Sequence, residues 1–253
     1  MVNNNYLELI VINPFNFENT KTVIIGGSSG LGLETAKAIS FLGGELVLAG
    51  RNEQKLLDAK ESIGKGSTKT YTLDNTNNEE IQKFFQEVGE FDYLFTPGAS
   101  YTRGPITASL DVAKSCFEGK FWPQYMAVKY ALPYIKPGGA IVLMSGAYSQ
   151  RPPNDGASYA ACNAAIESLG KALAIELAPI RVNVVAPGTI ATPFVWEDKS
   201  KEQRLESYDE YAKHCALAKV GEPIDIAQAV CYLLSNKYTT GSTLYPDGGY
   251  TLR

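Results

Sequence analysis

Short apolar runs alternate with helix-like segments along nearly the whole chain, and this alternation limits the folds it can adopt. The expected strands are 22–26, 45–50, 68–73, 92–96, 139–145, 181–187 and 242–246. The expected helices are 31–42, 52–63, 77–88, 108–135, 157–178 and 222–235, with Pro123 bending or breaking the fourth. Apolar runs separated by helices indicate parallel strands buried on both faces. The sequence therefore predicts an α/β fold, a doubly wound parallel sheet of about seven strands with helices on both faces.

The length and apolar content predict one large core. The chain has 253 residues, of which 45% are hydrophobic, so we expect a single domain over 1–253. Residues 1–20 precede the first expected strand and are interpreted as an N-terminal extension. This segment lacks a basic start and a long apolar stretch, so we expect neither a signal peptide nor a membrane span.

Charge, cysteine and histidine content argue against several classes of partner. The net charge is −4, and no basic run carries interleaved aromatic residues, so we expect no nucleic-acid partner. A single histidine, His214, and the lack of an H-E-x-x-H motif argue against a metal site. Four cysteines without a C-x-x-C spacing indicate reduced thiols in a cytoplasmic protein, namely Cys116, Cys162, Cys215 and Cys231.

The segment VIIGGSSGLG at 23–32 fits two catalytic motifs. Residues 26–30 match G-x-S-x-G, which in hydrolases presents a nucleophilic serine, here Ser28. That serine would follow the first strand rather than a later one, and its histidine partner would have to be His214. The same segment matches G-x-x-x-G-x-G, a loop that cradles a dinucleotide phosphate. The position after the first strand favours the phosphate loop.

The phosphate loop has a physical rationale. Gly26 permits a sharp exit from the strand, while Gly30 and Gly32 remove side chains where backbone approaches a pyrophosphate and where helix packs on sheet. The N-terminus of the following helix supplies free N–H groups and a positive dipole end. We therefore expect a Rossmann-type dinucleotide site that also includes the loop neighbours Ser28, Ser29 and Leu31.

The end of the second strand bears on the choice of nicotinamide cofactor. NAD sites place an acid there, but this chain has Gly50 followed by Arg51 and Asn52. An arginine can bind a 2′-phosphate with two hydrogen bonds, so NADP(H) is favoured and NAD(H) remains possible. The alternative is that Arg51 only caps a surface helix. Asp74, after the third strand, is expected to reach the adenine or to cap the next helix.

The chain resembles the short-chain dehydrogenase/reductase family, of the classical type, over nearly its whole length. The matching segments are GGSSGLG, Tyr159 in YAACN, IRVNVVAPGTIATP at 180–193 and GSTLYPDGG at 241–249. The resemblance implies hydride transfer between NAD(P)H and a carbonyl or alcohol, and a homodimer or homotetramer. It also implies that the nicotinamide end of the cofactor is bordered by Gly98, Pro187, Gly188, Ile190 and Thr192.

The catalytic tetrad implied by the resemblance is atypical here. Tyr159 keeps the position of the proton donor or acceptor, but the lysine expected four residues later is Asn163. The asparagine position falls on Lys120. We hypothesise an exchange in which the Lys120 ammonium enters the same pocket from the neighbouring helix and lowers the pKa of Tyr159. The alternative is that Lys120 faces solvent and the site is catalytically weak.

The serine position of the tetrad falls on Gly146, so Ser145 beside it is expected to polarise the substrate oxygen, with Tyr148 or Ser149 as substitutes. Tyr101 and Arg103, after the fourth strand, are expected to face the pocket. Residues 193–220 are interpreted as a substrate lid or, alternatively, an amphipathic surface helix. The candidate lid contacts are Phe194, Val195 and Trp196.

Together these features predict an NADP(H)-dependent short-chain oxidoreductase that acts on a small carbonyl or alcohol. The missing lysine and serine keep two alternatives open. One is a non-redox dehydratase or isomerase on the same scaffold. The other is a nucleotide-binding protein without turnover.

Overall fold

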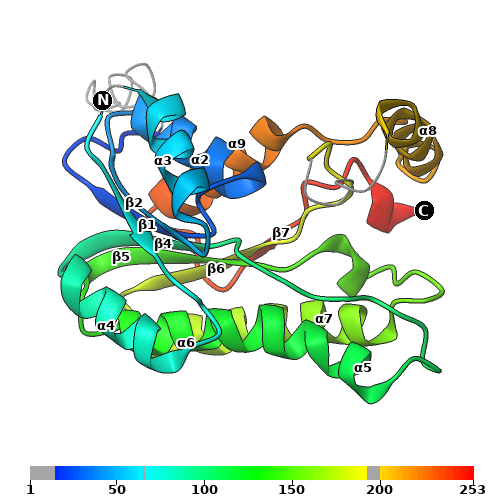
Figure 1. Ribbon diagram of the computed structural model, residues 1–253, viewed down its shortest axis with the longest axis horizontal. Helices are drawn as coiled ribbons and strands as arrows, with labels where there is room; N and C mark the ends of the chain where they lie inside the picture. The colour runs from blue at the N-terminus through cyan, green and yellow to red at the C-terminus, as the bar shows by residue number, and fades with distance from the viewer. Residues whose placement is uncertain (1–14, 65, 193–199) are drawn as a thin grey trace, which may run out of the picture.

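The computed structural model describes residues 15–64, 66–192 and 200–253, and a seven-stranded parallel sheet lies at its centre (Figure 1). The strand order is β3-β2-β1-β4-β5-β6-β7. The strands are β1 (Lys21–Ile25), β2 (Glu45–Gly50), β3 (Thr68–Thr72), β4 (Phe91–Thr96), β5 (Ile135–Met144), β6 (Arg181–Val185) and β7 (Thr243–Leu244). The predicted doubly wound parallel sheet is confirmed. β5 begins four residues earlier than predicted, and β7 is shorter.

Helices cover both faces of the sheet (Figure 1). One face carries α2 (Gly30–Phe41), α3 (Glu53–Ile63) and α9 (Pro223–Ser235). The opposite face carries α4 (Asn78–Val88), α5 (Leu110–Cys116), the π-helical turn η1 (Phe117–Phe121), α6 (Trp122–Ala131) and α7 (Ala157–Glu176). The remaining helices are α8 (Lys201–Ala212) and the 3-10 turns η2 (Ala147–Ser149) and η4 (Tyr250–Leu252). Within the described ranges, none of the helices combines the length and hydrophobicity needed to cross a lipid bilayer.

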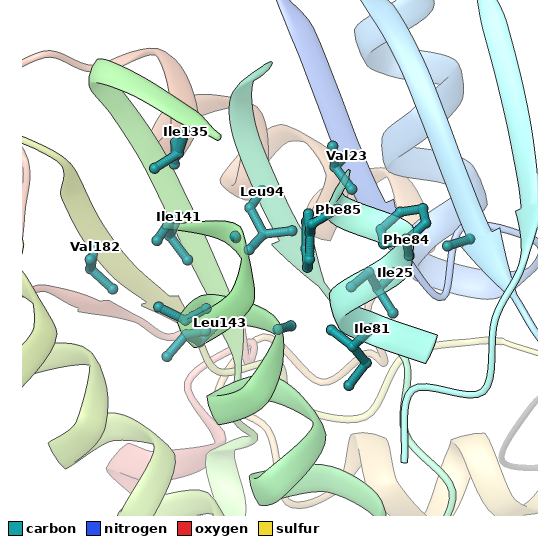
Figure 2. Packing of buried hydrophobic residues seen from close by; sticks show 14 of the residues in the cluster. Val23, Ile25, Ile81, Phe84, Phe85, Leu94, Ile135, Ile141, Leu143 and Val182 are labelled. Carbon is teal, nitrogen blue, oxygen red and sulfur yellow. The ribbon is translucent and has the colours of Figure 1, made fainter. Parts of the chain in front are cut away.

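The apolar residues of the central strands alternate between two cores, one on each face of the sheet. Val23 and Ile25 point to the core under α4, α6 and α7, whereas Ile24 points to the core under α2 and α9. Figure 2 shows the first core, where Phe84 and Phe85 of α4 pack against β1 and β4. Side chains on successive strand residues point to opposite faces, so a strand without polar alternation is buried on both.

Part of the predicted N-terminal extension belongs to the core. Phe17 is fully buried, and its ring packs edge-on against Tyr93 of β4 with the centroids 5.5 Å apart. The Phe17 N–H donates to the Leu42 carbonyl at the end of α2, and the Glu45 N–H of β2 donates to the Thr20 carbonyl at 2.8 Å. Residues 15–20 therefore pack against the α2 face of the sheet.

The predicted helix over 108–135 is divided into α5, η1 and α6, with Pro123 in the first turn of α6 as a predicted break. A proline is tolerated there because the first turn of a helix leaves N–H groups unpaired. The π-helical turn packs on the loop after β4: a Cβ at Gly119 would lie 1.7 Å from the Ser100 carbonyl oxygen. The Ser100 N–H donates to the Gly119 carbonyl at 3.0 Å. This packing directs Lys120, the next residue, into the interior.

Gln124 fixes the orientation of α6 against the sheet. Its side-chain nitrogen donates to the carbonyl oxygens of Lys120 and Met144, at 3.1 and 3.0 Å. Its side-chain oxygen accepts from the Met144 N–H and the Thr96 hydroxyl, at 2.7 and 3.0 Å. The buried amide thus uses both its donors and its acceptor to hold the turn that carries Lys120 at the ends of β4 and β5.

Candidate active site

A pocket of about 310 Å³ opens at the carboxyl ends of the parallel strands, where doubly wound sheets bind ligands. Most of the predicted site residues line it: Gly26, Ser28, Ser29, Gly30, Leu31, Gly32, Arg51, Gly98, Lys120, Ser145, Tyr159, Pro187, Gly188, Ile190 and Thr192. Asn163 lies behind the pocket wall and is fully buried. Asn52 and Asp74 are not among the lining residues.

Two glycines of the loop and first turn of α2, Gly26 and Gly32, leave no room for side chains. A Cβ at Gly32 would lie 2.0 Å from the Gly26 carbonyl oxygen, and a Cβ at Gly26 would lie 2.5 Å from the Gly98 Cα. Gly30 has a φ of +53° and faces open space. Ser29, which precedes α2, makes no side-chain cap, and the first turn carries no acidic residue. The helix N-terminus is therefore open to an anion, and these residues fit the diphosphate of a dinucleotide.

The residues after β2 and β3 have different roles. Arg51 is exposed and lines the pocket. The Asn52 side chain caps α3 by accepting from the Lys55 N–H at 2.9 Å, so it serves the helix rather than the pocket. Asp74 accepts from the N–H and hydroxyl of Thr76, and these bonds lower the pKa of its carboxyl, with a smaller contribution from Arg51. Both bonds are made by Oδ1 and form a turn that leads into α4, while the adenine contact of Asp74 stays a prediction.

Asn75 is a pocket residue that the sequence did not single out. It lines the pocket, and its side-chain nitrogen donates to the Gly98 carbonyl at 3.3 Å. The bond joins the end of β3 to the loop after β4, a contact across 23 residues that local patterning does not indicate.

Lys120 is buried beside Tyr159, as the exchange hypothesis expects. The lysine is 3% exposed, and its Nζ lies 5.0 Å from the centroid of the Tyr159 ring. The Nζ donates to the Ser145 carbonyl at 2.9 Å and to Oδ1 of Asn163 at 2.5 Å. This burial excludes the alternative in which Lys120 faces solvent. The cation enters from η1, whereas the amide that holds it comes from α7.

The pKa of Tyr159 lies below its usual value of 10.0. Burial by itself would raise the pKa, because it penalises the phenolate. The Lys120 ammonium, the hydrogen bond with Tyr101 and the Asn163 side chain outweigh that effect, and Arg103 adds to them. Tyr159 is therefore poised to exchange a proton at a lower pH than a free tyrosine.

The Ser145 hydroxyl is directed into α7. Its Oγ lies 2.9 Å from Oε1 of Glu167 and 3.0 Å from the Asn163 carbonyl oxygen, and it bonds both. Its geometry therefore does not support the prediction that Ser145 polarises the substrate oxygen. The Ser145 carbonyl, which accepts from Lys120, is the part of this residue that serves the site.

Glu167 is a buried carboxylate that the sequence analysis missed. It is 6% exposed and accepts from Ser145, Ser149 and Gln150, and from the Tyr245 hydroxyl at 2.7 Å. Because Ser149 is also engaged there, it does not replace Ser145 toward the substrate. An acid in the middle of the largely apolar sequence of α7 was the available signal, since a buried charge requires partners.

The substrate end of the pocket is aromatic. The Tyr101 hydroxyl donates to the Tyr159 hydroxyl at 2.9 Å, and the two rings stack with centroids 4.8 Å apart. The Arg103 guanidinium lies 5.5 Å from the Tyr159 centroid, so both residues after β4 face the pocket as predicted. Further pocket aromatics are Tyr148, Tyr211 and Tyr250.

Residues 193–220 were predicted to form a lid or a surface helix. Part of this segment forms α8, and Tyr211 on α8 lines the pocket. A hydrogen bond joins Tyr211 to Tyr148; burial, followed by this bond, raises the pKa of Tyr148. The candidate lid residues Phe194, Val195 and Trp196 lie outside the described residues. In the part of the chain that the structure describes, no cluster of three or more metal-ligating side chains occurs.

Comparisons with known proteins agree with this geometry. A family model described as enoyl-(acyl carrier protein) reductase matches residues 26–251. A glucose 1-dehydrogenase of Gluconobacter oxydans is 31% identical, over 93% of each chain. A 3-oxoacyl-(acyl-carrier-protein) reductase of Chlamydia muridarum is also 31% identical, over 91% of this chain and 97% of the relative. A small-chain dehydrogenase solved in complex with NADPH is 32% identical with a TM-score of 0.78, covering 93% of this chain and 100% of that one.

Proposed function

The chain belongs to the short-chain dehydrogenase/reductase family and is an NAD(P)-dependent oxidoreductase, and we propose that it transfers a hydride between NADP(H) and a small carbonyl or alcohol. The observation that carries the proposal is the contact of Tyr159, Lys120 and Asn163 at the pocket wall. The bound nicotinamide would supply or accept the hydride. The glycine loop and the segment at 187–192 would hold the cofactor.

The chain's own residues would handle the proton. In carbonyl reduction, Tyr159 gives its hydroxyl proton to the substrate oxygen, and the Lys120 ammonium stabilises the phenolate that remains. In alcohol oxidation, the phenolate takes the hydroxyl proton. Asn163 fixes the ammonium through its side-chain oxygen and completes an altered relay in which lysine and asparagine have exchanged helices.

Arg51 supports the preference for NADP(H). It lines the pocket after β2, where an acid would disfavour a 2′-phosphate. Arg51→Met should weaken NADPH binding by roughly tenfold or more, because it removes charge-assisted hydrogen bonds, and should leave NADH binding unchanged. Cofactor fluorescence titration measures both affinities. Lys60→Met, which removes an exposed cation on α3, the helix that follows Arg51, is the matched control. Equal loss of NADPH and NADH affinity would refute the role of Arg51.

Turnover tests the redox function itself. The absorbance of reduced nicotinamide, followed against a panel of carbonyl and alcohol compounds, should change with the wild-type protein and not with Tyr159→Phe. A protein that binds NADPH and converts a substrate without that change would be a non-redox dehydratase or isomerase. Binding without any turnover would indicate a nucleotide-binding protein.

We further propose a cytoplasmic homodimer or homotetramer. Trp122 and Tyr125 on α6 are 48% and 39% exposed and form an aromatic cluster with Phe121. Large exposed aromatic side chains favour an interface between subunits. The four cysteines are free and buried, which is compatible with a reducing compartment. Light scattering after size exclusion measures the oligomeric state, and a monomer at micromolar concentration would refute this proposal.

A further inference from the structure

Two phenols meet at the point where the substrate oxygen must bind. We propose that Tyr101 is a catalytic residue that donates a hydrogen bond to the substrate oxygen, in the position that the family resemblance gives to a serine. This inference rests on the proposed function. The Tyr101 and Tyr159 hydroxyls are 2.9 Å apart, with Tyr101 as donor, so an oxygen that bonds Tyr159 also comes within reach of Tyr101.

Among the described residues, no serine hydroxyl forms a hydrogen bond with the Tyr159 hydroxyl. The register of the tetrad puts Gly146 in the serine position, and Ser145 turns its hydroxyl to Glu167. A Cβ at Gly146 would lie 3.4 Å from the Tyr159 hydroxyl and 3.2 Å from the side-chain nitrogen of Asn163. Gly146 therefore brings no hydroxyl to the phenol, and Tyr101 supplies the second donor.

The pKa values of the two phenols are shifted in opposite directions. Catalysis by this pair requires one phenol that keeps its proton and one that gives it up. Burial and the neighbouring Tyr159 raise the pKa of Tyr101, so Tyr101 stays protonated and acts as a donor. The pKa of Tyr159 is lowered, so Tyr159 is the phenol that exchanges its proton. During reduction the substrate oxygen takes the Tyr159 proton, while Tyr101 keeps its own. Afterwards the Tyr101 hydroxyl returns to the Tyr159 phenolate.

The backbone on both sides of Tyr101 is fixed, which gives its donor a defined direction. The Ser100 N–H donates to Gly119 of η1 at 3.0 Å. The Thr102 N–H donates to the Ser115 hydroxyl at 3.0 Å, and that hydroxyl also donates to the Thr102 carbonyl at 2.9 Å. A donor held in place before the substrate arrives costs no reorganisation during the reaction.

Tyr101→Phe tests the proposal by two readouts. Ultraviolet titration of tyrosinate, with Tyr159→Phe to identify the Tyr159 signal, needs no substrate. That signal should move to higher pH, because the phenolate loses a hydrogen bond. With the best substrate of the panel, kcat should fall by roughly 100-fold while NADPH affinity is unchanged. Tyr130→Phe on α6, outside the pocket, is the matched control.

The outcomes distinguish Tyr101 from Ser145 as the group that polarises the substrate oxygen. An unchanged Tyr159 titration would overturn the proposal. A shifted titration with unchanged kcat would also overturn it, because Tyr101 would then act on Tyr159 alone. If Ser145→Ala lowers kcat and Tyr101→Phe does not, the serine is the polarising group. If the wild-type protein reduces no carbonyl, the proposed function fails, while the titration still tests the phenol pair.

A separate observation concerns the charge at the substrate end. Arg103 is exposed in the pocket, 5.5 Å from the Tyr159 ring, and no carboxylate of the described residues forms an ion pair with it. By contrast, Lys120 is buried and bonded, and Arg151 donates to the carbonyls of His214 and Tyr250. We infer that the substrate is an oxo acid whose carboxylate binds Arg103 while its carbonyl reaches the phenol pair.

Oxo acids compared with their own methyl esters test this inference, which also rests on the proposed function. The wild-type kcat/KM should favour the 2- or 3-oxo acid by roughly tenfold or more. Arg103→Met should remove that preference through KM, and Arg103→Lys should restore part of it. Esters reduced as well as acids, or a preference that survives Arg103→Met, would overturn the inference. Calorimetry of the oxo acid binding to the NADP-bound enzyme tests the inference even if no turnover is found. Equal affinity of the wild type and Arg103→Met for the acid would also overturn the inference.

Discussion

Replacement of Lys120 by methionine is expected to lower kcat by roughly 100-fold. The Lys120 Nζ lies 5.0 Å from the centroid of the Tyr159 ring. At that separation and an effective dielectric constant of about 20, Coulomb's law gives about 3 kcal/mol between the ammonium and a phenolate. Loss of about 3 kcal/mol of transition-state stabilisation corresponds to roughly a 100-fold lower rate.

The same variant should shift the pH dependence, and the sign follows from the pKa of Tyr159. Lys120 helps to keep that pKa below its usual value, so its removal raises the pKa. Alcohol oxidation needs the phenolate, and its rising limb should therefore move to higher pH. Carbonyl reduction needs the protonated phenol, and its decline at high pH should move in the same direction. Steady-state rates across a pH series in both directions measure the shift.

Exchanging the two residues between positions 120 and 163 should restore part of the lost activity. Nζ of Lys120 and Oδ1 of Asn163 are 2.5 Å apart, so Lys120→Asn combined with Asn163→Lys returns an ammonium to nearly the same place. The double variant should be at least about tenfold more active than Lys120→Asn alone, by the coupling expected of residues in contact. Lys129→Met, which removes an exposed cation beside Tyr130 on α6, is the matched control. A folded Lys120→Met protein with wild-type turnover and pH profile would refute the reasoning.

Three further substitutions test the supports of the site. Gly32→Ala places a Cβ 2.0 Å from the Gly26 carbonyl oxygen, and should abolish NADPH binding measured by cofactor fluorescence; retained affinity would contradict the predicted phosphate loop. Gly119→Ala places a Cβ 1.7 Å from the Ser100 carbonyl oxygen and should lower the free energy of unfolding by about 1–3 kcal/mol. Urea denaturation measures this change, and an unchanged midpoint would contradict the prediction. Glu167→Gln should lower the free energy of unfolding by about 2 kcal/mol, because the carboxylate accepts hydrogen bonds from several buried donors. Calorimetry should show a Tm lower by roughly 4–8 °C, and an unaltered Tm would argue against these hydrogen bonds.

The sequence predicted the features that depend on local periodicity. Buried strands without polar alternation predicted the layered sheet, and the glycine spacing at 26–32 located a loop whose geometry fits a diphosphate. The register of the family resemblance, rather than a local pattern, located the pair of Lys120 and Asn163, whose proximity the structure supports. The direction of the Ser145 hydroxyl was not predictable, because it depends on Glu167, 22 residues later and on another element. Tyr101 meets Tyr159 across 58 residues, a contact that no local pattern encodes.

The hydroxyls that Glu167 gathers come from distant parts of the polypeptide. Ser145 and Ser149 follow β5, whereas Tyr245 follows β7, a few residues before the chain ends. The Tyr245 hydroxyl therefore reaches the Glu167 carboxylate only when β7 has joined the edge of the sheet beside β6. We expect local opening of this edge strand to remove one donor from Glu167 and so to loosen α7, the helix that also carries Tyr159.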